Sequence, residues 1–90
     1  MYMGRVVGSI EASQKDDSLI GRKLMIVQQI NSDKEMIRYE EVASDTVGAG
    51  IGEYVLLVKG AGARKTNKES SQTRDVVDCA IVGIIDRFNK

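Results

Sequence analysis

The sequence contains no histidine, and this absence limits the chemistry that the chain can perform. Histidine is the commonest general acid–base residue near neutral pH and a frequent metal ligand. Without it, Ser-His-Asp triads, Cys-His pairs and most metal-assisted hydrolytic schemes are excluded. Carboxylates and lysines remain available for catalysis, so the sequence argues against an enzyme without proving that the chain is not one.

Cysteine is almost as scarce, because Cys79 is the only one in 90 residues. An intrachain disulfide is therefore impossible, and a structural zinc site within one chain is not expected. Cys79 lies in an apolar segment, which favours a buried thiol over a nucleophile. We expect one domain covering residues 1–90, with no metal and no cofactor. Domains this small usually need a disulfide, a metal or a partner chain for stability. Since the first two are not expected here, a partner chain is the remaining source of stability.

There is no excess of charge of either sign, since 13 Lys and Arg balance 13 Asp and Glu. Nucleic-acid-binding domains usually carry a basic excess, and single-strand binders also need aromatic platforms. The aromatic residues here number four: Tyr2, Tyr39, Tyr54 and Phe88. No apolar run approaches the ~20 residues of a membrane-spanning helix, and no signal peptide is visible at the N-terminus. We therefore expect a cytoplasmic protein with no nucleic-acid and no membrane partner.

Five segments have the short apolar or alternating patterns that are typical of β-strands. They are residues 2–12, 23–30, 37–44, 53–59 and 79–86, with turn signals between them. No segment predicts a helix of 10–12 residues, although the small residues of 60–64 favour one helical turn. A polar stretch at 65–74 predicts a variable loop. The pattern indicates an all-β fold, either a small barrel or a sandwich.

Three of these strands, residues 23–30, 53–59 and 79–86, are apolar on both faces. In a small closed barrel one face of each strand fills the interior and the other meets solvent. An identical neighbouring subunit is the simplest cover for the second face. The alternative is a monomer with scattered valine and isoleucine side chains on its surface.

The glycine-rich segment at residues 48–53 invites a phosphate-binding interpretation. The dinucleotide fingerprint needs G-x-G-x-x-G at the start of a helix, and a P-loop needs Gly-Lys followed by Ser or Thr. Here the spacing is G-x-G-x-G and a strand pattern follows. We therefore interpret the segment as a tight turn with positive φ angles or as a close-packing backbone. An enzyme built on a nucleotide-binding loop is the weakest of the alternatives.

Four stretches together closely resemble the EutN/CcmL family of bacterial microcompartment vertex proteins. They are SLIGRKL at 18–24, DTVGAGIGEYVL at 45–56, GAGAR at 60–64 and VDCAIVGIID at 77–86. The similarity extends over nearly the whole chain, and the run D-x-x-G-A-G-x-G-E followed by G-x-x-A-R is quite specific.

The resemblance implies a five-stranded OB-like barrel, with one or two short helical turns, that assembles into a pentamer. Such pentamers are structural and not enzymatic, and they cap the five-fold vertices of a shell whose facets are hexameric proteins. The partners implied are four further copies of the chain and the hexameric shell proteins. The runner-up, an OB-type nucleic-acid-binding module, stays open because OB barrels often bind single strands.

Two sets of residues are candidates for assembly contacts. The first is the loop expected to pack near the axial opening of the pentamer: Gly48, Ala49, Gly50, Ile51, Gly52 and Glu53. The second is a candidate subunit interface: Arg64, Met25, Val27, Val82 and Ile84. No catalytic residue is predicted.

Overall fold

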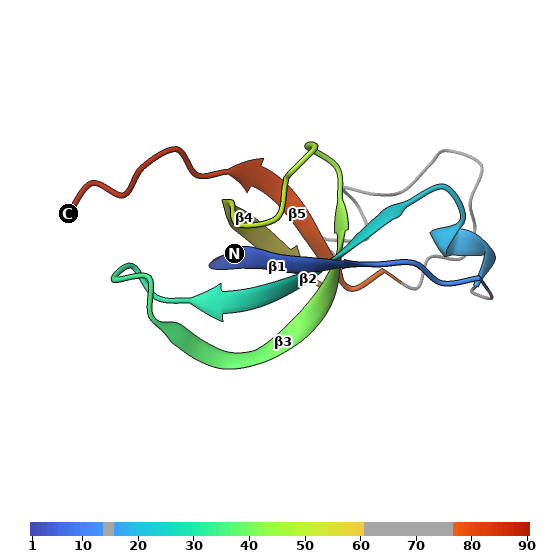
Figure 1. Ribbon diagram of the computed structural model, residues 1–90, viewed down its shortest axis with the longest axis horizontal. Helices are drawn as coiled ribbons and strands as arrows, with labels where there is room; N and C mark the ends of the chain where they lie inside the picture. Colours follow the sequence, from blue (N-terminus) through green and yellow to red (C-terminus); the bar gives the residue numbers. More distant parts are fainter. Residues whose placement is uncertain (14–15, 61–76) are drawn as a thin grey trace.

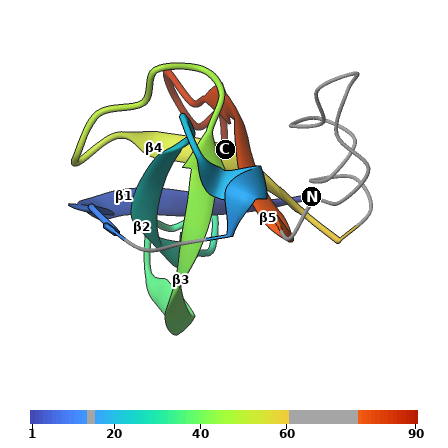
Figure 2. The ribbon, with the colours of Figure 1, turned by 90° about the vertical axis from the view of Figure 1, so that its right-hand side faces the viewer.

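A computed structural model describes residues 1–13, 16–60 and 77–90 of the chain. Its five strands are β1 (Tyr2–Ile10), β2 (Lys23–Ile30), β3 (Met36–Asp45), β4 (Tyr54–Lys59) and β5 (Cys79–Ile84). They close into one barrel in the order β1-β2-β3-β5-β4, with β4 paired to β1 (Figures 1 and 2). Every pair is antiparallel except β3 with β5. The predicted all-β, five-stranded OB-like barrel is confirmed.

The one helical segment of the described residues is η1, a 3-10 turn at Asp17–Leu19 between the first two strands. Asp16 starts this turn by accepting a hydrogen bond from the backbone N–H of Ser18 at 3.0 Å. The segment is too short and too polar to cross a membrane. Most of the helical turn predicted at 60–64, and all of the polar loop predicted at 65–74, lie outside the described residues.

The barrel interior is filled by small and medium apolar side chains from all five strands and from Ala49. Along β2, Met25 and Val27 point inward and are 2% and 0% exposed. Leu24 and Ile26 alternate with them and are half-buried on the outer face. Both sides of this strand are apolar, so the sequence determines the alternation but not which side faces in. The assignment of Met25 and Val27 to a subunit interface is corrected here, because their side chains belong to the core.

A bulge at Val7 interrupts the alternation predicted for the first strand. Val6 pairs with Val27 and Gly8 pairs with the next residue back, Ile26, so Val7 has no partner on β2. The side chains of cross-strand partners point to the same face of the sheet. After the bulge, each side chain of β1 therefore points to the face opposite to the one that strict alternation would give it. Ile10 pairs with Leu24 and thus lies on the outer face, whereas strict alternation from the buried Val6 would place it inside.

A larger bulge reshapes the beginning of β3. Gln28 pairs with Glu40, but Ile30 pairs with Met36, so three residues of β3 lie opposite one of β2. Within this bulge Arg38 adopts a φ of 110°, which is rare for a residue with a side chain. The buried Gln28 side chain donates a hydrogen bond to the Arg38 carbonyl at 2.8 Å and holds this conformation.

The seam between β3 and β5 is short, since only Ser44 with Ala80 and Asp45 with Ile81 are paired. Among the described residues, positions 36–43 of β3 therefore have a strand neighbour on the β2 side alone. Side chains bridge the rest of the seam. Glu41 accepts a hydrogen bond from the Tyr2 hydroxyl and forms an ion pair with Lys59, whose Nζ atom lies 2.8 Å from a Glu41 oxygen. The Tyr2 hydroxyl also lies 3.0 Å from the Cys79 Sγ atom.

Candidate functional site

The β3–β4 loop, residues 46–53, contains the glycine-rich segment and turns sharply at two of its glycines. Gly48 has a φ of 77° and Gly52 a φ of 95°, in the left-handed region that favours glycine. β4 begins directly after the loop, and no helix follows it. The interpretation as a tight turn is thus confirmed, and the helix that a dinucleotide site requires is missing from this position.

Side chains from two strands hold the first half of this loop. Asp45 accepts hydrogen bonds from the backbone N–H groups of Val47 at 3.0 Å and Gly48 at 3.1 Å. Lys23 of β2 lies 3.4 Å from the other Asp45 oxygen and donates to the Ala49 carbonyl at 3.1 Å. The Asp45 side chain is fully buried, so Lys23 both neutralises it and ties the loop to the barrel.

The second half of the loop is fixed by its own carboxylate and by β1. Glu53 accepts a 2.6 Å hydrogen bond from the Gly50 N–H. The backbone of Val6 bonds to Gly52 at 2.7 Å and to Glu53 at 2.9 Å. Arg5 Nε donates to the Gly52 carbonyl at 3.3 Å. The loop is therefore held in place by contacts within its own chain.

The loop directs one apolar side chain inward and others outward. Ala49 is fully buried and joins the barrel core. Ile51 is 65% exposed and Val47 is 39% exposed. Exposed apolar side chains on a rigid support are suited to packing against another protein surface, because little conformational freedom is lost on binding.

The remaining candidate interface residues are partly brought together with this loop. Val82 and Ile84 are half-buried, and Ile84 pairs with Val55 of β4, close to where the loop ends. Thr46 at the start of the loop donates a 2.8 Å hydrogen bond to the Ile81 carbonyl. Met25 and Val27 lie inside the barrel instead, and Arg64 lies outside the described residues.

The structure also contains an apolar surface that the sequence analysis missed, on the first half of β3. Exposed fractions there are 67% for Met36, 37% for Ile37, 68% for Tyr39 and 44% for Val42. The sequence predicted a strand at residues 37–44, but charged residues are interspersed among these four apolar ones and conceal the exposed surface. The signal could not be found by alternation, since the bulge around Arg38 breaks the period of two.

The buried polar groups are suited to structural roles. Burial raises the pKa of the Tyr2 hydroxyl far above its usual range, and its hydrogen bonds to Cys79 and Glu41 act in the same direction. Burial also raises the pKa of the Cys79 thiol, against the opposing effect of the Tyr2 hydrogen bond. The hydrogen bond to Glu41 raises the pKa of Lys59. At neutral pH this cluster holds a neutral phenol and a neutral thiol, so Cys79 is not an activated nucleophile.

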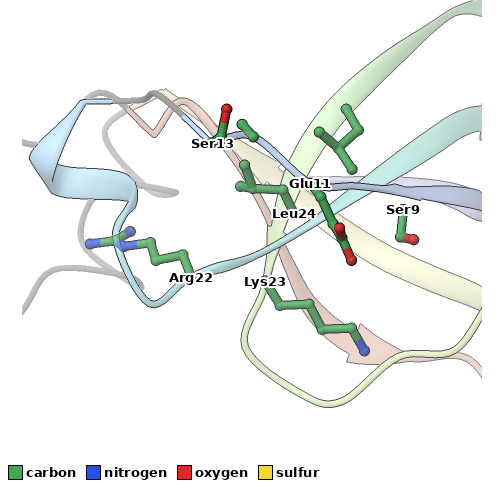
Figure 3. A pocket seen from close by; sticks show the side chains of 8 residues that line it. Ser9, Glu11, Ser13, Arg22, Lys23 and Leu24 are labelled. Carbon is green, nitrogen blue, oxygen red and sulfur yellow. The ribbon is translucent and has the colours of Figure 1, made fainter.

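An open hollow of about 640 Å³ lies between the end of β1 and the start of β2 (Figure 3). Its two cationic side chains do not converge, because Arg22 and Lys23 point away from each other (Figure 3). Lys23 also donates its hydrogen bond to the Ala49 carbonyl of the β3–β4 loop. In the part of the chain that the structure describes, no three Cys, Asp or Glu side chains are grouped to hold a metal ion. The hollow offers no evident ligand site.

Comparisons with known proteins agree with this geometry. Residues 1–86 match the family model described as "Ethanolamine utilisation protein EutN/carboxysome". The shell vertex protein PduN of Salmonella typhimurium is 42% identical, and the match covers 99% of both chains. The carboxysome shell vertex protein CcmL of Thermosynechococcus vestitus is 39% identical over 100% of this chain and 88% of its own.

Solved structures give the same result. The pentameric microcompartment shell protein GrpN of Rhodospirillum rubrum superimposes with a TM-score of 0.87 at 36% identity, covering 100% of this chain and 99% of GrpN. CcmL of Nostoc sp. PCC 7120 superimposes with a TM-score of 0.83 at 39% identity, covering 96% of this chain and 89% of CcmL.

Proposed function

The chain belongs to the EutN/CcmL family, and we propose that it is a structural protein of a bacterial microcompartment shell whose pentamers cap the vertices. The observation that carries this proposal is the combination of close vertex-protein relatives with a rigid loop that exposes Ile51 and Val47. A domain of this size needs a partner surface for stability, and a ring of identical subunits provides one.

The shape of a closed shell explains why a pentamer is needed. A flat layer of hexagonal tiles cannot close on itself, and five-fold units introduce the curvature at the vertices. We infer that hexameric shell proteins surround each pentamer. The compartment then lies in the cytoplasm, where the shell would enclose its enzymes.

The candidate residues acquire definite roles in this proposal. The β3–β4 loop, with Gly48 to Glu53, forms a packing surface of the pentamer. Val82 packs against Val77 and Ala80, and Ile84 packs against the barrel core, so we propose that their half-exposed parts contribute to the same interface. Arg64 would pair with a carboxylate near the subunit boundary. The chain acts by occupying a position in the shell, so it needs no catalytic group and no cofactor.

The OB-type nucleic-acid module remains the runner-up from the sequence. It has the same barrel topology in its favour, but the net charge of zero opposes it. The relatives that cover the whole chain are shell vertex proteins.

Deletion of the gene in a compartment-forming bacterium tests the proposal. Electron microscopy of the deletion strain should show elongated or unclosed shells, because the vertices lack their cap. Expression of the chain from a plasmid should restore closed polyhedra. Normal polyhedral shells in the deletion strain would contradict the proposal.

A further inference from the structure

Six of the eight exposed large hydrophobic side chains among the described residues lie in two groups on opposite sides of the barrel. Both ribbon views place the β3–β4 loop at the upper edge of the molecule and the beginning of β3 at the lower edge (Figures 1 and 2). The loop exposes Ile51 and Val47, and the β3 segment, residues 36–42, exposes Met36, Ile37, Tyr39 and Val42. Among the described residues, the other large hydrophobic side chains with comparable exposure are Met1 and Ile20.

Both surfaces are ordered within the isolated subunit. The loop is held by Asp45, Lys23 and Glu53 through the bonds described above. The β3 segment is held by its bulge, in which Arg38 keeps a positive φ that is unfavourable for a residue with a side chain. A conformation of this kind persists where the surrounding structure imposes it, and here the Gln28 side chain does so.

A closed ring of identical subunits requires two different surfaces on each subunit. In such a ring, one surface of a subunit meets the other surface of the next, and the contact is heterologous. Interfaces of permanent assemblies are also more apolar than the rest of the protein surface. The loop and the β3 segment satisfy both conditions, because each exposes large apolar side chains among its polar ones and the two lie on opposite sides of the barrel.

We propose that Ile51 and Val47 of one subunit pack against the β3 segment of the next subunit around the ring. This inference rests on the proposed pentamer and names its contact surfaces. The β3 segment is a suitable receptor because, within the described residues, it has a strand neighbour on one side only. In this arrangement each loop touches the β3 segment of a neighbour, whereas a loop at the five-fold axis would touch other copies of itself.

Chemical cross-linking of cysteine variants distinguishes these arrangements. The double variant Ile51→Cys/Tyr39→Cys, treated with a short bis-maleimide, should give a ladder of covalent species up to five chains. Each single variant should stay monomeric on a denaturing gel, because neither position meets its own copy. The native Cys79 is buried and should not react.

The matched control is Ile20→Cys/Tyr39→Cys. Ile20 is 64% exposed, nearly the same as Ile51, but it lies next to η1 and not on the loop. This control should give no ladder. A ladder from Ile51→Cys alone would place the loops together at the axis and overturn the inference, and a ladder from Tyr39→Cys alone would indicate a symmetric β3 contact and also overturn it.

The native mass of each variant separates failure of this inference from failure of the pentamer. A five-chain mass without any ladder in the Ile51/Tyr39 variant would overturn the contact but leave the proposed function intact. A monomeric mass for the unaltered chain would refute the pentamer itself. If the double variant does not assemble, Ile51→Asp should weaken the ring and Ile20→Asp should not; equal pentamer yields for these two would overturn the inference.

Discussion

At the scale of single residues, Gly4 shows how closely the barrel interior is packed. A Cβ atom at this position would lie 2.6 Å from Leu57 Cδ1 and 3.1 Å from the Gln28 carbonyl oxygen. The backbone oxygen cannot move without disturbing the β1–β2 pairing. Gly4 therefore allows β1 to cross over the core at a point where no side chain fits.

Replacement of Gly4 by alanine should lower the free energy of unfolding by about 1–3 kcal/mol, the usual cost of overpacking a core. Urea denaturation at one fixed protein concentration measures the change. Gly8→Ala is the matched control in the same strand. Its Cβ would lie 3.3 Å from the end of the Ile26 side chain, which can move, so its effect should be clearly smaller. Equal effects of the two substitutions would refute this explanation.

The titrating groups at the seam predict how stability depends on pH. The folded state raises the pKa values of Cys79, Tyr2 and Lys59. Above about pH 9 the unfolded chain therefore loses protons that the folded chain keeps, and the free energy of unfolding should fall as the pH rises. The thiol of the unfolded chain begins to lose its proton somewhat earlier, so these three groups should contribute no slope only below about pH 7.

Tyr2→Phe should flatten this decrease, since it removes one of the three groups from the balance. Urea midpoints between pH 8 and pH 11 for both proteins check the prediction. An unchanged slope in Tyr2→Phe would show that the buried hydroxyl does not titrate as its surroundings indicate.

At the scale of elements, the strands differ in how far the sequence predicted them. The bounds of β2, Lys23–Ile30, were predicted correctly because apolar residues fill the strand and turn residues flank it. The direction in which Met25 and Val27 point was not predicted correctly, because both faces of β2 are apolar. The bulges at Val7 and Arg38 depend on pairing between strands, which no local pattern records.

The candidate site was predicted unevenly for the same reason. The β3–β4 loop was found because its glycines and the run from Asp45 to Glu53 are local signals. The exposed surface around Tyr39 was missed because it results from the β3 bulge. The hydrogen bond that joins Tyr2 to Glu41 links positions 39 residues apart, a distance over which no sequence period operates.

The side-chain bridge across the seam predicts the behaviour of β3. Glu41→Ala removes the acceptor of Tyr2 and the ion-pair partner of Lys59, a loss of about 1 kcal/mol for partly exposed groups. Backbone amides at 36–43 should then exchange hydrogen roughly fivefold faster, while those of β2 near Met25 change less. Glu40→Ala, at the exposed residue that precedes Glu41, is the control and should leave the hydrogen-exchange rates unchanged. Uniform acceleration in all strands would contradict the local role of Glu41.

At the scale of the whole molecule, the need for a partner was predicted from size, but its place was not. The sequence predicted that a neighbouring subunit covers the outer apolar faces of β2, β4 and β5. In the folded chain the outer side chains Leu24, Leu56 and Val82 are already half-buried. Among the described residues, six of the eight exposed large hydrophobic side chains lie instead on the β3 segment and the β3–β4 loop, and the other two are Met1 and Ile20. That the neighbours form a five-membered ring is part of the proposed function, which is supported by the likeness to the pentameric shell protein GrpN.

The proposed function depends most on the closure of this chain into a ring of five. Native mass spectrometry of the purified protein over a wide range of concentrations tests it directly. The account predicts a dominant species with five times the 9.9 kDa mass of one chain, and no ladder of open intermediates. A mass near that of a single chain at every concentration, or a dominant ring with a different number of subunits, would contradict it.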